Sequence, residues 1–457
     1  MLSPEQIKFI LDDLRSPHTI EHFKKDLELF QFYNGATKPI IKEYIKKEFK
    51  KPETIEEMIG RLVPLNFLRK VVNKKAGVYI EAPLRVAPNK DTADAELLAE
   101  YEETLNLNQV MKEFNRYFKL NKRAILEIYT DGGFPALKLL PAHTYKVYSF
   151  DKKNPTKPEV VVKFMGDKKL LVWTKEELFF LDDKGQKSPV DGGDMTNPYG
   201  ELPFIYACDS IFSTMPILDD DMMSMSIAIP VALTDLMFGL KYQAWPIIYT
   251  IGANGELTGG PQAVYQLDYQ ANGQKPEIGV VSPEFDAEKI LNSVKFLLDS
   301  WLSTNNLSNN YSGSFSAGNA VSGVSKMLDY SENVEDKKDQ QAVFYQVEND
   351  LWYKIKDVFI PYWRKTKELD QYIDKEFSKD FEVYISFKDP KPFMSEKEKV
   401  EIAKLKIDSQ LSSKRAEIKN LNEDYDDEMV DNLVEEIIAE QGNVFGSMES
   451  DLPDQTE

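Results

Sequence analysis

The first 75 residues have the apolar spacing of successive amphipathic helices. The segment SPEQIKFILDDLR opens with a Ser-x-x-Gln capping box at Ser3, and FKKDLELFQFYNG ends in an Asn-Gly stop signal. Farther on, VYIEAPLRVA alternates like a strand, whereas LLAEYEETLNLNQVMKEFNRYFKL places Leu, Val, Met and Phe at helical spacing. The pattern predicts a helical N-terminal region followed by a mixed one.

The pattern changes to short strands between Arg123 and Phe180. Six segments rich in β-branched and aromatic residues are separated by Gly, Pro, Asp and Lys turns: AILEIYT, ALKLLPA, YKVYSF, EVVVKFM, LLVWT and LFFLDD. This succession predicts one meandering antiparallel sheet. The turn TNPYGELPFIYA, from Thr196 to Ala207, then leads toward a long helix.

Two apolar helices enclose a small β-rich insert. The first runs from about Leu218 to Tyr242, with Pro230 expected to kink or disturb it, and the second runs from Asp286 to Leu302. Residues 246–284 between them are punctuated by Gly and Pro. The two stripes that we expect to pair are Leu233, Leu236, Met237 and Leu240 with Ile290, Val294, Leu297 and Leu298. We expect the further apolar flank, Met222, Met225 and Ile229, to be covered by copies of the same chain around an axis.

An uncharged polar stretch, residues 303–323, follows the second helix. It holds six Ser, five Asn and three Gly among 21 residues. Such a loop can touch a polyanion without gripping it, because neutral side chains release few counterions; a solvated linker is the open alternative. A helix of about forty residues is expected next, ending near Pro361, and then a lone strand, Phe381–Phe387. Two helices, EKEKVEIAKLKIDSQ and DEMVDNLVEEIIAEQ, precede an acidic tail that we expect to be disordered.

Composition and charge narrow the class of protein. The 457 residues allow a large core, and length suggests about two to four domains. The net charge of −20 argues against tight phosphate binding, although an acidic wall can surround nucleic acid if repulsion is useful. Cys208 is the single cysteine, which excludes an intrachain disulfide and fits a reducing compartment. The N-terminus lacks the pattern of a signal peptide, and Pro230 and Asp235 interrupt the most apolar segment, so we expect a soluble intracellular protein with no membrane span.

Little in the sequence suggests catalysis. His18 and His22 lie four residues apart, a possible metal spacing, but SPHTIEHF reads better as a helix start with exposed histidines. Cys208 is expected to be a small buried thiol, and nucleotide-binding and nucleophile-elbow glycine motifs are missing from the sequence. The carboxylates 219–221 are expected at a helix start, where the helix dipole favours acids. We predict no catalytic, cofactor or metal site, with carboxylate-only catalysis left open.

Four segments, in order along the chain, resemble portal proteins of tailed bacteriophages. They are NKKAGVYIEAPLRV (Asn73–Val86), AILEIYTDGGFPALKLLPAHTYKVYSFD (Ala124–Asp151), NPYGELPFIY (Asn197–Tyr206) and GNAVSGVSKMLDYSE (Gly318–Glu332). The resemblance covers about residues 3–440 and implies a portal-like α+β fold in a ring, commonly of twelve subunits, at one capsid vertex. Double-stranded DNA would be packaged and ejected through its channel without sequence specificity. The clip-like insert is short and the C-terminal part is modest and strongly acidic, so their contacts are the least defined.

The resemblance also divides the chain into parts. It implies a wing (1–216, with the long helix and return strand of 324–394), two stem helices (217–245 and 286–303), a clip (246–285), a tunnel loop (304–323), crown helices (395–445) and a tail (446–457). The implied partners are the large terminase subunit, the major capsid and scaffolding proteins, and a head-completion or tail adaptor. The protein would assemble in the host bacterial cytoplasm and reside in the virion.

The implied site residues belong to three of these parts. The tunnel loop would face DNA through Asn305, Asn306, Ser308, Asn309, Asn310, Tyr311, Ser312, Ser314, Ser316 and Asn319. Lys241, Lys289 and Lys295 of the stem would make weak contacts with DNA, and a solvated helix face explains them equally well. Tyr265, Asp268, Tyr269 and Lys275 belong to the clip. The alternatives are another ring-forming head-tail adaptor, which is usually much shorter, and a soluble carboxylate-dependent enzyme.

Overall fold

The computed structural model describes the whole chain except residues 49, 88–91, 167–168, 191, 245–246, 252–276, 282–285, 308–322, 368–374, 388–395, 423–424, 426–427 and 438–457. The chain divides into two compact units, Met1–Asp389 and Pro390–Glu457. The first contains both helices and strands, as the α+β expectation requires. The tunnel-loop residues from Ser308 to Asn319, the four clip residues and the acidic tail lie outside the described residues.

The N-terminal region is helical, as its apolar spacing predicts. Its helices are α1 (Pro4–Leu14), α2 (Pro17–Tyr33), α3 (Thr37–Glu48), α4 (Pro52–Gly60) and α5 (Phe67–Lys75). The capping box is confirmed: Ser3 Oγ accepts from the Gln6 backbone N–H at 3.2 Å, and Gln6 Oε1 accepts from the Ser3 N–H at 2.9 Å. Ser16 caps α2 in the same way through the N–H of Thr19. These caps satisfy backbone donors that a helix start leaves free.

The mixed region contains β1 (Leu84–Val86), α6 (Thr92–Thr104) and α7 (Leu107–Asn121). The predicted strand over VYIEAPLRVA is too long, because pairing with β12 (Tyr384–Ser386) covers three residues only. The helix α7 buries Met111, Phe114 and Phe118 and supports the sheet beside it. The strand expected at Phe381–Phe387 is likewise shorter than its apolar run.

The strands between Arg123 and Cys208 form two sheets, so the single meander that we predicted there is wrong. One sheet has the order β3-β2-β9 and the other the order β4-β5-β6-β7-β8, with all pairs antiparallel. A short 3₁₀ turn, Ala142–Thr144, separates β3 from β4, and β9 takes the free edge of β2. The bounds are β2 (Arg123–Asp131), β3 (Phe134–Leu140), β4 (Tyr145–Tyr148), β5 (Val160–Phe164), β6 (Leu170–Thr174), β7 (Leu178–Leu181), β8 (Lys187–Ser188) and β9 (Phe204–Cys208).

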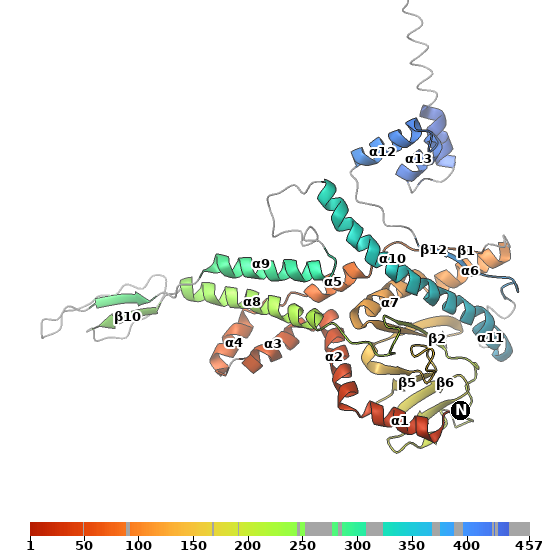
Figure 1. Cartoon of the computed structure of the whole chain (residues 1–457), viewed down its shortest axis with the longest axis horizontal. Coiled ribbons are helices and arrows are strands. Elements are labelled where there is room, and N and C mark those ends of the chain that lie inside the picture. Colours follow the sequence, from red (N-terminus) through yellow and green to blue (C-terminus); the bar gives the residue numbers. More distant parts are fainter. Residues whose placement is uncertain are drawn as a thin grey trace, which may run out of the picture. The chain divides into compact units, whose positions relative to one another are not determined.

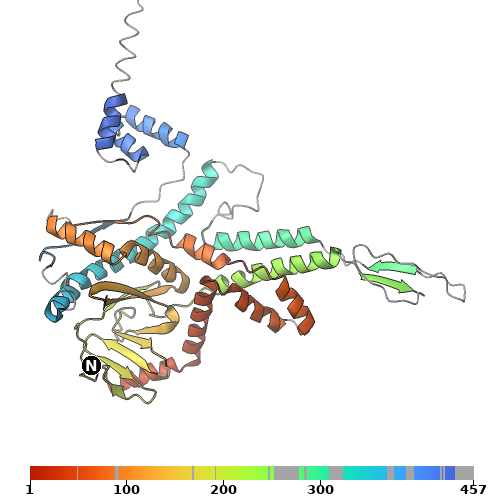
Figure 2. The same cartoon turned by 180° about the vertical axis from the view of Figure 1, so that it is seen from behind.

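Two antiparallel helices lie side by side in both views (Figure 1 and Figure 2). They are α8 (Asp220–Ala244) and α9 (Ala287–Thr304), and between them in sequence come β10 (Ile247–Ile251) and β11 (Glu277–Val281). The strands pair in an antiparallel register with Ile247 opposite Val281. A helix, a β-hairpin and a returning helix therefore occur in the predicted order.

The long helix after the polar stretch extends beyond its predicted end. It comprises α10 (Gly323–Lys354), a π-helical turn (Ile355–Phe359) and α11 (Ile360–Thr366). In the π turn the N–H of Ile360 bonds to the Ile355 carbonyl, and Pro361 then falls in the first turn of α11. A proline is tolerated in a first turn, so Pro361 does not end the helix.

The cores join elements that are far apart in sequence. The largest packs α7, β2 and β9 against α10 and α11, with the Phe344 ring edge-on to Tyr79, Phe114 and Phe118 at 5.3, 5.9 and 5.5 Å. A second joins α2–α5 to α8 and α9, and α1 covers the five-stranded sheet.

The second unit is built from α12 (Glu396–Asp408), α13 (Lys414–Leu421) and a helix over residues 428–437. Arg415 on α13 forms a two-pronged ion pair with Asp431, and Lys406 Nζ lies 3.4 Å from Glu417 Oε1. The two predicted C-terminal helices are therefore present, with α13 between them.

Candidate functional site

One side of the first half of α8 is buried within its own chain. Met222 and Ile229 are 4% and 0% exposed, in a core with side chains from α2–α5 such as Phe32 and Ile41. The expectation that copies of the chain cover this flank is therefore wrong for Met222 and Ile229, whereas Met225 is half-buried. The cause is a long-range packing of α3, α4 and α5 onto α8 that apolar spacing does not reveal.

The helix α8 continues through Pro230, which removes one backbone donor from its interior. Two hydroxyls in this part of the helix are fully buried and hydrogen-bonded. Thr234 Oγ1 donates to the Pro230 carbonyl at 2.7 Å and accepts from the Val63 N–H at 3.2 Å, and Ser226 Oγ donates to the Met222 carbonyl at 2.6 Å. The Thr234 bonds tie the helix to the chain between α4 and α5.

The far half of the α8–α9 pair leaves apolar side chains in solvent. Of the two predicted stripes, Val294 and Leu298 are buried, whereas Met237, Leu240 and Leu297 are 44%, 38% and 37% exposed. The Phe296 ring next to them in sequence is 70% exposed. The two helices pack together as predicted, and they leave these four apolar side chains partly in solvent.

A hydrogen-bonded junction fixes the start of the polar stretch. Asp221 Oδ2, in the first turn of α8, accepts from Trp301 Nε1 at 3.1 Å and from Asn305 Nδ2 at 3.3 Å. Lys75 Nζ donates to Asn305 Oδ1 at 2.8 Å, and Leu307 is buried in the core beneath. Burial, with repulsion from Lys119, lowers the pKa of Lys75 despite nearby carboxylates. The last turn of α9 and residues 305–307 are thus held by α5 and α8.

The two tunnel-loop candidates that the structure describes, Asn305 and Asn306, differ in their exposure to solvent. The Asn305 side chain is buried, and its amide bonds within the chain, which favours a role in positioning the loop over contact with a ligand. Asn306 is exposed and has a left-handed φ of 55°, the conformation in which asparagine is the best-tolerated residue after glycine.

The three stem lysines do not form a cluster of free cations. Lys241 forms an ion pair with Glu57 of α4. Lys289 is exposed and lies 3.0 Å from Asp286, the residue that caps α9, and Lys295 is half-buried. Sequence reasoning missed Glu57, because nothing in local spacing predicts that α4 reaches α8.

The acidic run at 219–221 stands at the helix start, as predicted. The helix α8 begins at Asp220, and Lys122 Nζ and Lys25 Nζ donate to Asp219 and Asp220 at 2.6 and 3.2 Å. With Asp221 bonded to Trp301, all three carboxylates have structural partners.

The described part of the insert requires a glycine at one position. Gly279 lies opposite Tyr249 in the β10–β11 register, and a Cβ at Gly279 would meet the Tyr249 ring at 2.1 Å. An aromatic ring over a cross-strand glycine stabilises a two-stranded hairpin that has little other support. The alternation of the two segments does not reveal this pair.

A buried ion pair fastens α10 to the rest of the first unit. Arg85 donates to Glu348 through Nε at 2.9 Å and through a terminal nitrogen at 2.6 Å, and both side chains are 0% exposed. Tyr79 Oη donates to Glu348 at 2.9 Å, and Arg85 also bonds to Glu102 and Asn108 at 2.8 Å. Burial, together with the Glu348 carboxylate, raises the pKa of Tyr79 well above its usual value.

The histidine expectation is partly wrong, because His22 is buried. Its Nε2 lies 3.0 Å from a terminal nitrogen of Arg123, which also pairs with the buried Asp26. Burial, and then the Arg123 charge, lower the pKa of His22 to about 3. In the described part of the chain no three His, Cys, Asp or Glu side chains gather as metal ligands.

Cys208 is half-buried, whereas we expected a buried thiol. The thiol donates to the Ser213 carbonyl at 3.3 Å, and burial raises the pKa of the thiol.

By length and composition alone, α8 passes as a membrane-crossing helix over Asp220–Lys241, in contrast to our expectation from Pro230 and Asp235. Among the described residues it is the one such helix. A core helix of a soluble protein passes the same test, and one such helix is weak evidence for a membrane protein.

A comparison with protein families gives one match, and it spans nearly the whole chain. The family model described as phage portal protein, SPP1 Gp6-like, matches residues 16–443. A comparison with curated proteins found no match. The match includes both helices of the α8–α9 pair, the polar stretch and α10.

Proposed function

Because the chain belongs to the family of SPP1 Gp6-like phage portal proteins, and is therefore a portal protein of DNA packaging and viral assembly, we propose that its copies form a ring whose channel is lined by the α8–α9 pair and the polar loop. The observation that carries this proposal is the order of elements in the first unit. A helix, a β-hairpin and a returning helix lead directly into the uncharged stretch 303–323, which is anchored at its start.

The parts of the chain take the following proposed roles. The stem is 217–245 with 286–303, the clip is 246–285, and the tunnel loop is 304–323. The wing is 1–216 with 324–394, the crown is 395–445, and the tail is 446–457. The number of subunits that we propose is twelve, the number common among portal rings.

The exposed apolar side chains of the stem support contacts between copies. Phe296, Met237 and Leu240 are 70%, 44% and 38% exposed in one chain, although α4 reaches the same part of α8 through Glu57 and Lys241. In a ring of identical subunits each stem meets a neighbour head-to-tail, and the contact closes around the axis. Burial of these side chains then supplies part of the free energy of assembly.

The charge of the chain supports passage of DNA rather than tight binding. With a net charge of −20 and an uncharged loop, few counterions are released on contact, so each step along the duplex has a low barrier. Lys241 is paired with Glu57, so Lys289 and Lys295 are the better candidates for weak contacts with phosphates. The described loop residue proposed for DNA contact is Asn306, and Asn305 positions the loop.

The proposed partners follow from the same assignment. The capsid and scaffolding proteins meet the wing, the large terminase subunit meets the clip during packaging, and a head-completion or tail adaptor meets it afterwards. The proposed clip contacts are Tyr265, Asp268, Tyr269 and Lys275. Assembly takes place in the host cytoplasm, and the ring then resides at one vertex of the virion.

Negative-stain electron microscopy of the purified protein at several salt and protein concentrations tests the ring. We expect radially symmetric particles with a central hole. Compact monomers under all conditions, including after addition of scaffolding and capsid proteins, would contradict the proposal.

A second experiment tests the loop. Replacement of Ser312, Ser314 and Ser316 by Lys is expected to slow packaging or ejection of DNA while rings still form. The same three residues replaced by Asn keep the loop neutral and serve as the control. Unchanged DNA translocation in the Lys variant would show that the loop does not face DNA.

The two alternative functions, a head-tail adaptor and a soluble carboxylate-dependent enzyme, are less well supported. A head-tail adaptor is usually much shorter and does not explain a family match over residues 16–443. The portal family is structural rather than enzymatic, and no observation of the described residues favours a catalytic site. We therefore propose no second function.

A further inference from the structure

The solvent side of α2 carries a continuous apolar stripe. Ile20, Phe23, Leu27 and Phe30 are spaced by three, four and three residues, so they lie along one side of the helix. Ile20 and Leu27 are 43% and 37% exposed, and Phe23 and Phe30 are half-buried. A different side of α2, which includes Asp26, packs against the rest of the unit. Phe23 and Phe30 also contact Phe164 and Tyr117 within the chain, whereas Ile20 and Leu27 leave much of their apolar surface in solvent.

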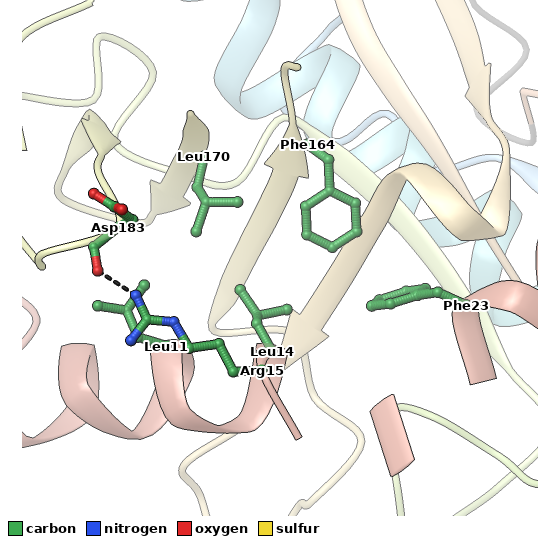
Figure 3. Close-up of a pocket in the computed structure, with 7 residues that line it drawn as sticks. All are labelled: Leu11, Leu14, Arg15, Phe23, Phe164, Leu170 and Asp183. Atoms are coloured by element: carbon green, nitrogen blue, oxygen red, sulfur yellow. Dashed lines mark hydrogen bonds between the residues drawn. The ribbon is translucent and has the colours of Figure 1, made fainter. Parts of the chain in front are cut away.

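Phe23 and Phe30, on either side of Leu27 in the stripe, each line a hollow. The first hollow, of about 400 Å³, lies between α1, Phe23 and the β5–β6 hairpin, where the rings of Phe23 and Phe164 meet edge-on at 5.1 Å (Figure 3). The second, of about 410 Å³, is lined by Phe30 with Tyr117 of α7 and Leu139 of β3. Both are mostly apolar and open to solvent.

The α2 residues that line the two hollows are spaced by two helical turns. Phe23 and Phe30 are seven residues apart, which is two helical turns and about 10 Å along the axis. A partner helix laid along α2 presents side chains at i and i+7 with the same spacing, and such pairs of apolar anchors are how amphipathic helices fill grooves.

A cation stands at the rim of the first hollow. Arg15 donates to the Asp183 carbonyl, which uses one of the five N–H donors of its guanidinium. Figure 3 shows the bond from this group to the Asp183 carbonyl, with the Asp183 carboxylate pointing away from the guanidinium. The rim therefore suits an acidic side chain, because arginine forms strong two-pronged bonds with carboxylates.

We propose that the α2 stripe with its two hollows is a docking groove for an amphipathic helix of another protein. That helix carries apolar side chains at i and i+7 for the two hollows and a Glu or Asp that reaches Arg15. The groove is on α2 and the sheets, apart from the exposed side chains of the α8–α9 pair, and it requires neither the channel nor the clip assignment.

The probe is a fluorescein-labelled peptide of three heptads, with Leu at the first and fourth positions, and Glu, Ala and Lys elsewhere. Fluorescence anisotropy is measured as the full-length protein is added, beside a scrambled peptide of the same composition. We expect saturable binding of the patterned peptide only. Leu27→Glu should weaken it about tenfold or more, and Glu28→Ala, on the polar side of α2, should not change it.

Reversal of the charge at Arg15 tests whether this residue pairs with an acidic side chain of the peptide. Arg15→Glu should weaken binding of the Glu-containing peptide, and a peptide with Lys in place of that Glu should restore it. Equal binding of the scrambled peptide, or no effect of Leu27→Glu, overturns the proposal. A smaller assembly of Leu27→Glu in light scattering also overturns it, because a second copy of the chain would then occupy the groove.

Discussion

The replacement of Glu348 by Ala tests the ion pair that fastens α10 to the first unit. The Glu348 carboxylate accepts two hydrogen bonds from Arg85 and one from Tyr79, and its side chain and that of Arg85 are fully buried. Its loss leaves the Arg85 charge buried, which typically costs about 3–5 kcal/mol. Arg85 keeps its bonds to Glu102 and Asn108, and the Glu102 side chain is 27% exposed. We therefore expect Glu348→Ala to lower the free energy of unfolding by about 3 kcal/mol, near the lower end of this range.

The assay is urea unfolding of the full chain, followed by tryptophan fluorescence. Trp352 is one turn beyond Glu348 on α10 and is 3% exposed, so it reports on this core. A loss of about 3 kcal/mol is a large share of the 5–15 kcal/mol typical of a folded domain, and it moves the midpoint clearly to lower urea. Glu348→Gln, which keeps the shape and part of the bonding, covers the case in which Glu348→Ala does not fold.

Two further variants test whether the stranded Arg85 charge causes the loss of stability. Replacement of both partners, Arg85→Met with Glu348→Leu, removes the stranded charge and should recover most of the loss. Glu43→Ala breaks an exposed pair with Lys46 and should leave the midpoint unchanged. A wild-type midpoint for Glu348→Ala would refute the argument. A double variant as unstable as Glu348→Ala would show that packing, rather than charge, is at stake.

Three other changes have distinct expected outcomes. Thr234→Val leaves the half-buried N–H of Val63 without its acceptor, and we expect the free energy of urea unfolding to fall by about 1 kcal/mol. The pKa of His22 is lowered from 6.5 to about 3 by burial and Arg123, so between these values the unfolded chain binds the proton and the folded one does not. Stability should therefore fall as pH falls through this window, by less than about 1.4 kcal/mol per unit, and His22→Gln should flatten the decline whereas the exposed His18→Gln should not. Phe296→Glu changes a side chain that is 70% exposed, so we expect an unchanged unfolding midpoint and fewer rings in light scattering; intact rings would show that this side chain is not between copies.

Local pattern predicted most of the elements and few of their pairings. Helix spacing predicted a helical region over residues 3–75, one helix where α6 and α7 stand, and α8 and α9, and alternation predicted β2 to β7. Each of these signals depends on neighbours within a turn or two. The assignment of β9 to the edge of β2 depends on residues more than 70 positions apart, and no period marks it. The same holds for Glu348, whose partner Arg85 is 263 residues away.

The candidate site was predictable only in outline, because composition and spacing are local signals and contacts between distant segments are not. The uncharged stretch and the two helices before and after the insert are visible in composition, but the anchoring of Asn305 by Lys75 and Asp221 is not. The apolar side chains of the first half of α8 have the same pattern whether α2–α5 or a second copy covers them. A histidine pattern likewise does not show that Arg123 lies beside His22.

The π turn at Ile355–Phe359 has a consequence for how relatives of this chain align. A π turn holds one residue more than an α-helical turn, so the helix face shifts by one position across it. Phe344 and Leu351 before the turn, and Phe359 and Trp363 after it, consequently point into one core. A relative that lacks one residue in this stretch can close the turn to α-helix and keep both halves in place. A single-residue gap here is therefore a change of local winding, and sequence comparisons across it should count the two halves of the helix as separate registers.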